Sequence, residues 1–229
     1  MSDIEIFNQR LKSESFSGQK VNKFIAVESE FLDCSFQDMI IKDICFGGGT
    51  KQTKYVNCTF DNTSFSSNVL GVARFENCSF KNVKVKKFFC IDAEFINCVF
   101  SGEIKQGNFV GKHRDVDGKT RTNEIQDNDF TGLVFGDVGF TNIDLSMQKF
   151  TQNENLAVIT DVSSFISNIK SEVEKITDFA MYDSAVKVLT ILEMESDGGN
   201  NQMLVDKLSF PKKLQEAAEL VLSYRKLEN

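Results

Sequence analysis

The sequence predicts a repeat architecture over its first two thirds, followed by a C-terminal α-helical module. Apolar residues recur every five positions from about residue 6 to residue 150. A short motif, Asp/Asn-Cys-x-Phe, occurs four times within that range. Beyond it, the apolar spacing changes to that of an amphipathic helix. We therefore expect two parts, a repeat domain at 1–152 and a helical module at 153–229.

The five-residue period holds over long runs of consecutive steps. It starts at Ile6, slips once within 47–53, continues from Tyr55 to Phe100, and returns from Phe130 to Phe150. An α-helix would place apolar residues at intervals of 3.6 and a strand at intervals of 2, so this segment fits neither. The position two residues before each apolar centre is also small or apolar. Each five-residue unit thus presents two side chains inward and three outward.

This pattern resembles the pentapeptide-repeat family, whose units read roughly Ala-(Asp/Asn)-Leu-x-x around a central Leu or Phe. The resemblance covers about residues 6–150, with Phe dominating the centre and Cys often replacing the family's Ala. It implies a mainly β fold with an α tail: a right-handed quadrilateral β-helix followed by the helical module. Each side of such a β-helix is one five-residue unit, and each coil has about twenty residues.

The four cysteine motifs fit a coil of that length. Successive motifs from "YVNCTF" onward are spaced by 20, and "FLDCSF" precedes them by 24, which is 20 plus the four-residue slip. We therefore expect one interior ladder, stacked at the spacing of neighbouring strands, made of Cys34, Cys58, Cys78 and Cys98 beside Phe36, Phe60, Phe80 and Phe100. Parallel side chains do not converge as a zinc site or a disulfide requires. The ladder is predicted to be structural, whereas Cys45 lies off the inward pattern and is expected to be exposed.

Two segments interrupt the period, at 47–53 and at 111–128. The first, "GGGTKQT", lacks the Ser/Thr after Lys that a phosphate-binding loop requires, so we interpret it as a surface bulge. The second is long and polar, and it is either a recognition element or a tolerated insertion. Its candidate interaction residues are Lys112, His113, Arg114, Asp115, Asp117, Lys119 and Arg121.

Residues 153–229 predict three or four helices. Apolar residues from Val162 to Leu192 follow helical spacing, 197–201 reads as a turn, and a last helix is expected with Pro211 in its first turn. A β-helix end has unpaired strand edges that need a cap. We expect these helices to cap the last coil and to provide a partner or homodimer surface.

Catalytic motifs are missing from the sequence. A single His leaves little from which to build a catalytic dyad, and no metal-protease, nucleophile-elbow or dinucleotide signature occurs. We predict a protein that is not an enzyme and has no cofactor or metal. No apolar run is long enough to cross a bilayer, and no secretion signal is visible, so a cytoplasmic protein with free thiols is expected.

Charge narrows the choice of partners. The chain carries a net −7 and has a pI near 4.9, which argues against direct nucleic-acid binding. Residues 1–150 hold 20 acidic and 18 basic residues, a net −2, while 151–229 hold 13 and 8, a net −5. Residues 51–100 alone hold 7 basic and 4 acidic residues, a net +3. The rod is therefore nearly neutral, although duplex DNA carries one charge per about 1.7 Å.

The predicted function is a protein–protein interaction scaffold that uses a rod face, the 111–128 loop and the helical tail. One alternative comes from the family resemblance: a DNA mimic that inhibits or protects DNA gyrase or another topoisomerase. Another alternative is a regulatory or immunity protein that docks an effector through its helical tail. The first alternative predicts salt-sensitive competition with DNA, and the second predicts tight binding through the tail.

Overall fold

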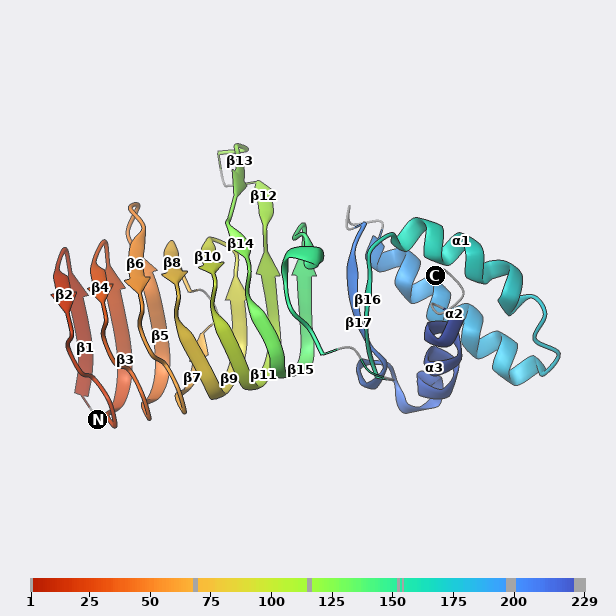
Figure 1. Cartoon of the computed structure of the whole chain (residues 1–229), viewed down its shortest axis with the longest axis horizontal. Helices are drawn as coiled ribbons and strands as arrows, with labels where there is room; N and C mark the ends of the chain where they lie inside the picture. Colours follow the sequence, from red (N-terminus) through yellow and green to blue (C-terminus); the bar gives the residue numbers. More distant parts are fainter. Residues whose placement is uncertain are drawn as a thin grey trace. The chain divides into compact units, whose positions relative to one another are not determined.

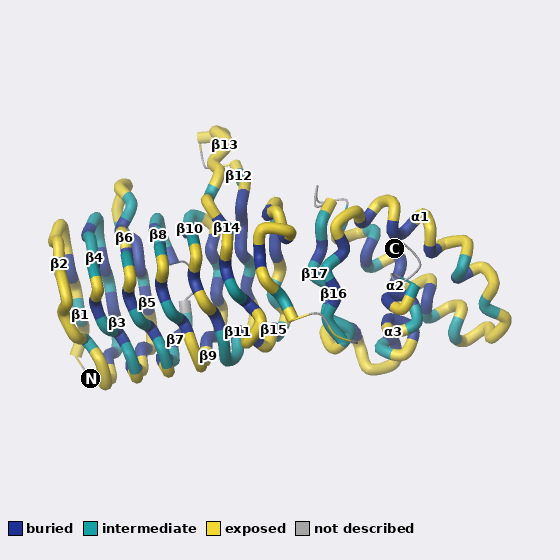
Figure 2. Tube along the Cα trace, in the orientation of Figure 1, coloured by how far each residue is buried: buried dark blue, intermediate teal, exposed yellow. Residues whose placement is uncertain are grey.

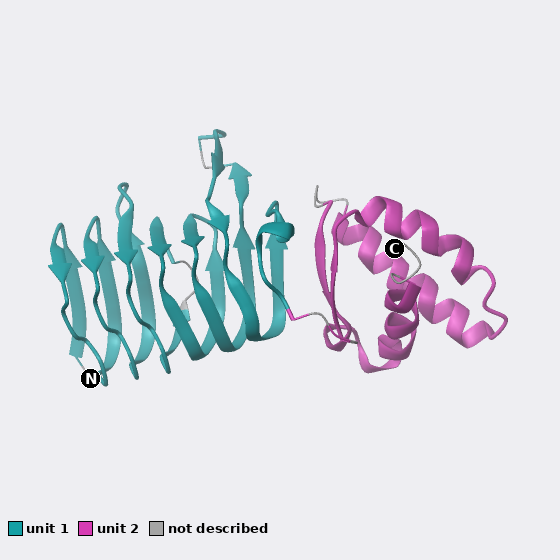
Figure 3. Ribbon diagram, viewed as in Figure 1, with its two compact units in different colours: residues 1–150 teal, residues 151–229 magenta. Residues whose placement is uncertain are grey.

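A computed structural model describes residues 2–67, 70–114, 117–151, 153, 155–196 and 201–224 of this 229-residue chain. The chain divides into two compact units, Met1–Phe150 and Thr151–Asn229 (Figures 1 and 3). The first unit is built from strands. The second combines α-helices with a pair of short strands. None of the helices that the structure describes is both long and apolar enough to cross a membrane.

Two parallel sheets form the walls of the first unit. The seven-stranded sheet has the order β1-β3-β5-β7-β9-β11-β15; these strands are Ser2–Phe7, Lys20–Val27, Ile40–Gly48, Ser64–Ser67, Ser79–Cys90, Val99–Val110 and Asp129–Thr141. The six-stranded sheet has the order β14-β10-β8-β6-β4-β2; these strands are Ile125–Gln126, Ala93–Ile96, Ala73–Glu76, Thr53–Val56, Glu30–Leu32 and Arg10–Lys12. Buried positions recur at matching places in successive strands (Figure 2).

The strand register gives the length of one coil. Tyr55 pairs with Phe75, and Phe75 pairs with Phe95, so successive coils advance by the spacing that the motifs predicted. Phe31 pairs with Tyr55, and this coil is longer because the slip at 47–53 lies within it. The pairing confirms the predicted β-helix with a helical tail.

Aromatic rings fill the interior in two stacked columns. Phe36, Phe60, Phe80 and Phe100 stack with ring centroids 4.7–4.9 Å apart and interplanar angles of 4°. The second column contains Phe31, Tyr55, Phe75 and Phe95, with centroids 4.7–4.9 Å apart. This separation is the spacing of neighbouring strands. Rings of the two columns meet edge to face, as Phe75 and Phe80 do at 5.4 Å and 71°, which is a favoured aromatic geometry.

The Asp or Asn before each motif cysteine has a backbone role. Asp33, Asn57, Asn77 and Asn97 all have φ between 51° and 55°, in the left-handed region that Asn and Asp tolerate better than other side-chain-bearing residues. Their side chains form rungs between coils: the Asn57 amide donates to Asp33 at 3.1 Å, and the Asn97 amide donates to Asn77 at 2.7 Å. The motif thus specifies a corner of the coil, with an interior residue directly after it.

The cysteine column ends in buried polar residues. Asn128 takes the place of Cys98 one coil later and is completely buried. Its side chain accepts a hydrogen bond from the Cys98 backbone N–H at 2.9 Å and donates to the Phe95 carbonyl at 2.8 Å. It also donates to Gln148 at 3.0 Å, and Gln148 in turn donates to the Ile125 carbonyl at 2.8 Å. Buried amides are tolerated at this place because their polar atoms find partners.

The slip at 47–53 is a short loop between β5 and β6. The Glu28 carboxylate accepts hydrogen bonds from the backbone N–H groups of Thr50 at 3.1 Å and Lys51 at 3.3 Å. Beside it, Gly47 and Gly71 bring two coils into backbone contact, since a Cβ at Gly47 would lie 2.2 Å from the Val72 carbonyl oxygen. The loop is therefore tied to the preceding coil.

A second irregularity escaped the sequence analysis. The five-residue period was not followed beyond Phe100, yet β11 continues the β-helix. Phe100 pairs with Phe80, but Gly102 pairs with Val83, so the period loses one residue there. Ile104 and Phe109 are buried as the next centres. A fixed step of five misses them because this deletion shifts every later position by one.

The second unit, Thr151–Asn229, has its own hydrophobic core, to which each of its helices contributes. Its α-helices are α1, α2 and α3, at Val162–Val173, Phe179–Ser196 and Gln215–Ser223, and β16 at Leu156–Ile159 pairs with β17 at Met203–Asp206. This antiparallel pair was not predicted, because four-residue strands are too short to show a period. The last helix starts at Gln215, later than predicted, after a 3₁₀ turn capped by Pro211.

The corner residues give a direct test of the left-handed backbone. We expect Asn77→Ala to lower the free energy of unfolding by about 1–2 kcal/mol more than Asn77→Gly does, because only Gly adopts this φ without strain. Both variants lose the hydrogen bond that the Asn97 amide donates to residue 77. The difference between their free energies of unfolding therefore measures the backbone strain alone. Urea denaturation of the two variants measures it, and equal losses would contradict the interpretation.

The loop contacts of Glu28 predict a pH dependence. Backbone hydrogen bonds from Thr50, then Lys51, lower the pKa of Glu28. A lowered pKa stabilises the folded state above the ordinary pKa of the group, and this contribution is lost as the pH falls through the folded pKa. We expect Glu28→Gln to be less stable than the wild type near neutral pH and equal to it in acid. Thermal unfolding of both proteins across the acidic range tests this, and a pH-independent difference would contradict it.

Candidate interaction surface

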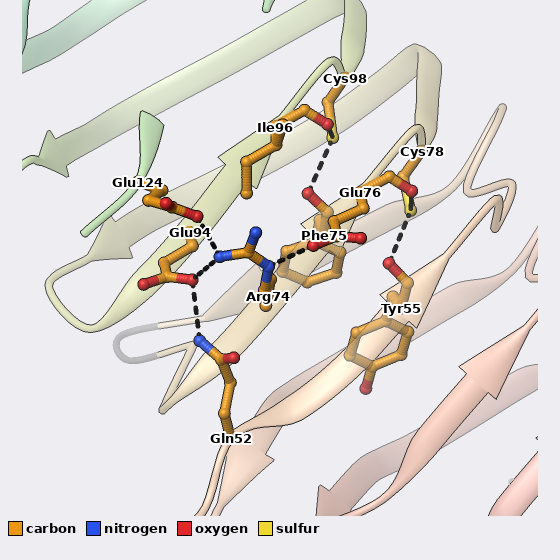
Figure 4. Close-up of polar contacts among 10 residues, drawn as sticks. All are labelled: Gln52, Tyr55, Arg74, Phe75, Glu76, Cys78, Glu94, Ile96, Cys98 and Glu124. Atoms are coloured by element: carbon orange, nitrogen blue, oxygen red, sulfur yellow. Dashed lines mark hydrogen bonds and ion pairs between the residues drawn. The ribbon is translucent and has the colours of Figure 1, made fainter. Parts of the chain in front are cut away.

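The predicted interior ladder lies inside the β-helix and is not accessible. Cys34, Cys58, Cys78, Cys98 and the four phenylalanines beside them are at most 2% exposed. The thiols lie within hydrogen-bonding distance of carbonyl oxygens, as Cys78 does of Tyr55 and Cys98 of Phe75, both at 3.4 Å (Figure 4). Burial raises the pKa of Cys78 and of Cys90, which keeps both thiols protonated and unreactive. Cys45 is half-buried rather than exposed.

The 111–128 segment was predicted to be a polar loop, but it contains a β-hairpin. Strand β12 at Lys112–Arg114 pairs antiparallel with β13 at Thr120–Thr122, and His113 lies opposite Arg121. The hairpin projects from the coils of the β-helix (Figure 1). Strand β14 follows and rejoins the six-stranded sheet. The short strands escaped notice because each has only three residues.

Side-chain amides fix the base of this hairpin. The Asn123 amide donates to the carbonyls of Ile91 at 2.6 Å and Val110 at 2.7 Å. The Asn142 amide donates to the Lys112 carbonyl at 2.9 Å. A Cβ at Gly111 would lie 2.2 Å from the Asn142 carbonyl oxygen, so the chain enters the hairpin through a position that fits only glycine. The hairpin is held in a defined orientation on its coil.

Asp92 links the two hairpin strands to the coil beneath. Its carboxylate lies 3.0 Å from His113 Nε2 and 4.0 Å from Arg121 Nη1. The His113 side chain is only 15% exposed. Its Nδ1 atom is buried and has no hydrogen-bond partner among the residues that the structure describes. The single histidine therefore packs into the base of the hairpin.

A cluster centred on Arg74 lies next to this base. The guanidinium contacts Glu76, Glu94 and Glu124, with a distance of 2.6 Å to Glu94, and Gln52 donates to Glu94 at 3.0 Å (Figure 4). Burial alone would lower the pKa of Arg74, but the three carboxylate hydrogen bonds outweigh it and raise this pKa. Arg74 and Glu94 are 23% and 16% exposed. The cluster joins β8, β10 and the residue before β14.

A small pocket of about 260 Å³ lies between the cluster and the hairpin. It is lined by Gln52, Val72, Asp92, Glu94, Arg121, Thr122 and Asn123. Charges of both signs border it, which suits a polar or charged group of a partner better than an apolar one. No group of three or more His, Cys, Asp or Glu in the described part of the chain could hold a metal ion.

The predicted interaction residues lie mostly at the surface of the hairpin. Lys112, Arg114, Asp117, Lys119 and Arg121 are exposed, His113 is half-buried, and Asp115 lies outside the described residues. The sequence analysis missed Arg74, Asp92, Glu94 and Glu124. Arg74 and Glu94 are directly paired on neighbouring strands, one coil apart. Comparison of outward positions at the coil spacing, rather than of neighbours in sequence, would have found them.

The partly buried ion cluster should be more sensitive to substitution than an exposed ion pair. We expect Glu94→Gln to lower the free energy of unfolding by about 1–3 kcal/mol, since it removes the negative charge that pairs with Arg74 and replaces the carboxylate that Arg74 and Gln52 share with a neutral amide that has one acceptor oxygen. The matched control is Glu103→Gln, which removes the exposed pair to Lys105 and should cost less than about 1 kcal/mol. Urea denaturation at low salt measures both, and equal losses would contradict the structural role of the cluster.

Comparison with protein-family models and with curated protein sequences gives no match. Among solved structures, two that match are trypsin-treated variants of QnrB1, described as a plasmid-mediated fluoroquinolone resistance protein. One has 17% identity and a TM-score of 0.18, and the alignment covers 60% of this chain and 84% of that chain. The other has 15% identity and a TM-score of 0.23, covering 60% and 92%. At these scores the fold assignment rests on the coil geometry itself.

Proposed function

Because the chain is a pentapeptide-repeat protein whose parallel strands pair in register from coil to coil, we propose that it works without catalysis, by binding another protein. The binding site is the hairpin surface, which we define as the exposed side chains Lys112, Arg114, Asp117, Lys119 and Arg121 together with the pocket at the hairpin base. One observation carries the proposal: a polar hairpin fixed by Asn123 and Asn142 projects from an otherwise regular scaffold. Rigid scaffolds that present such segments commonly use them for recognition.

The chemistry of the candidate nucleophiles supports binding over catalysis. Five of the six cysteines are buried, and burial raises the pKa of Cys34, Cys78 and Cys90. A hydrogen bond with Cys78 lowers the pKa of Cys58, but this thiol is 1% exposed, whereas a nucleophilic cysteine needs both a lowered pKa and access to its substrate. The only histidine is held at the hairpin base by Asp92. A catalytic dyad needs its base beside a nucleophile. In the part of the chain that the structure describes, Nε2 of His113 faces the Asp92 carboxylate and Nδ1 has no hydrogen-bond partner, so neither ring nitrogen contacts a hydroxyl or a thiol.

A DNA-mimic action on a topoisomerase is the alternative that comes from the family resemblance. The polar side chains that stack at the corners of successive coils argue against a DNA mimic. Asn57, Asn77 and Asn97 occupy one corner, and Asn62 and Asn82 occupy another. The first rung of each corner includes a carboxylate, Asp33 or Asp38, but the later rungs Asn82–Asn62 and Asn97–Asn77 are neutral amide pairs. A corner with a carboxylate on every coil would carry one charge per about 4.8 Å, against one per about 3.4 Å along a single DNA strand, and these two corners carry fewer. The net charge of +3 on residues 51–100 also argues against a DNA mimic.

A second alternative places binding on the helical unit, either with an effector or with a second copy of the chain. Helix α2 supports it, because Phe179 is 82% exposed, and Tyr182 and Val186 are 37% and 38% exposed. These residues follow each other at helical spacing and form one apolar stripe. Exposed apolar stripes of this kind often mark interaction sites.

One capture experiment separates the three functions. The full-length protein is used as bait in lysate at low and high salt, alongside Arg114→Glu/Lys119→Glu in the hairpin and Phe179→Asp on α2. The matched control is Lys42→Glu/Lys54→Glu, which makes the same charge change at exposed positions elsewhere on the rod. Our proposal predicts a partner that the hairpin variant fails to retain and the other two variants keep.

The other outcomes would each replace this proposal. If only the Phe179→Asp variant fails to retain the partner, the binding site lies on the helical unit. A topoisomerase captured by all variants and released at high salt would favour the DNA mimic. Loss with the control variant to the same extent as with the hairpin variant would indicate non-specific charge effects.

A further inference from the structure

Four lysines gather on the outer face of β9 and β11. Lys84, Lys86 and Lys87 are exposed on β9, and Lys105 is exposed on β11. Lys86 and Lys105 are directly paired across the two strands, an arrangement in which like charges repel. The stretch runs into the hairpin, since Gly111 follows the end of β11 at Val110.

Carboxylates neutralise these charges only in part: Glu103 lies opposite Lys84 across the two strands, and Asp137 lines the same hollow as Lys87. Lys105 pairs with Glu103 at 3.0 Å, with both side chains about half exposed. Lys84, Lys86 and Lys87 make no ion pair with any carboxylate in the part of the chain that the structure describes. A repeated position that stacks like charges one strand spacing apart is unfavourable in the free protein. Binding of an anionic group relieves that repulsion.

The surface is hollowed at the same place. Two adjoining pockets of about 480 and 450 Å³ share Lys87, Gln106 and Asp137, which occupy one corner of successive coils. These three residues all have positive φ, between 59° and 62°. The two pockets form what we call the lysine groove, which runs across β7, β9, β11 and β15 and is lined by Ser66, Lys86, Lys87, Phe89, Lys105, Gln106, Gly107, Gly136, Asp137 and Gly139.

Glycines line the lysine groove, and at two of them close packing leaves no room for a larger side chain. A Cβ at Gly107 would lie 2.7 Å from the Phe88 carbonyl oxygen, and a Cβ at Gly136 would lie 3.2 Å from Lys105 Cγ. Larger residues at these positions would displace the neighbouring strand or the lysine. The hollow therefore lies between the Lys86–Lys105 pair and the corner formed by Lys87, Gln106 and Asp137.

We propose that the lysine groove binds an extended acidic peptide segment of a protein partner. The groove crosses four strands, about 14 Å at the usual strand spacing, which matches four or five residues of extended chain. Lysines are flexible point charges that pair readily with single carboxylates, whereas rigid bidentate recognition of phosphate favours arginine. The overall charge of −7 also opposes nucleic acid.

This inference deepens the proposed protein-binding function and rests on it for the nature of the partner. The test uses fluorescein-labelled octaglutamate as the probe, with fluorescence anisotropy at low salt. We expect Lys86→Gln/Lys105→Gln to weaken binding about tenfold. The matched control, Lys20→Gln/Lys23→Gln, removes two exposed charges from β3 of the same sheet and should change the affinity less than about twofold. Thermal unfolding verifies that each variant is folded.

Three results would overturn the proposal. Wild-type protein that does not bind octaglutamate at low salt would show that the groove does not recognise acidic peptides. Equal weakening by the groove and control variants would reduce the effect to general electrostatics. Tighter binding of an eight-nucleotide single-stranded DNA than of octaglutamate would assign the groove to nucleic acid.

The hairpin variant Arg114→Glu/Lys119→Glu distinguishes this inference from the proposed function. A hairpin variant that loses its partner in the capture experiment and still binds octaglutamate separates the two sites. Octaglutamate binding that depends on the groove lysines, combined with no captured partner, would refute the hairpin proposal alone. Partner capture that persists without any octaglutamate binding would refute the groove alone.

Discussion

Stacking of identical side chains at strand spacing is the constraint on which the rest of the structure depends. Phenyl rings 4.7–4.9 Å apart and nearly parallel can only be built if every coil returns to the same place in the wall. Any insertion must therefore leave the wall entirely, as the 47–53 loop and the β12–β13 hairpin do. Any deletion must be absorbed locally, as at Gly102. The interior tolerates chemical change, shown by buried Asn128 and Gln148 in the cysteine column, more readily than a change of length.

The same regularity controls the surface. Outward side chains also repeat at strand spacing, so charges line up in ladders unless other residues intervene. Neutral amide rungs such as Asn77–Asn97 avoid repulsion at two corners. At Arg74 one guanidinium lies beside the carboxylates of Glu94 and Glu124 from the following coils, and these opposite charges make a compact cluster. Lys86 and Lys105 are directly paired like charges in the lysine groove, as Lys54 and Arg74 are elsewhere in the wall. The groove differs because its paired lysines line a hollow, and this combination is the basis for proposing it as a binding surface.

Function in such a scaffold is expected where the five-residue period is interrupted or where like charges are stacked on the outer surface. The hairpin base shows the first feature, because Asp92 connects an inserted element to the regular wall, and the lysine groove shows the second, because Lys86 and Lys105 are directly paired there. At the hairpin base, hydrogen bonds from Asn123 and Asn142 keep the exposed hairpin side chains oriented before any partner arrives. A preoriented surface loses less conformational freedom on binding.

The sequence alone determined the β-helix, the stacked Cys and Phe columns and the helical tail, because each follows from a short period repeated many times. Only the tertiary structure decided what depends on contacts between distant residues. It revealed the one-residue deletion at Gly102, the β16–β17 pair, the hairpin within 111–128, and the meeting of Arg74 with Glu94 and Glu124. Coil winding brings residues 20, 30 or 50 positions apart into contact. A period read along the chain locates the walls, but side-chain chemistry across coils depends on how each irregularity shifts the register.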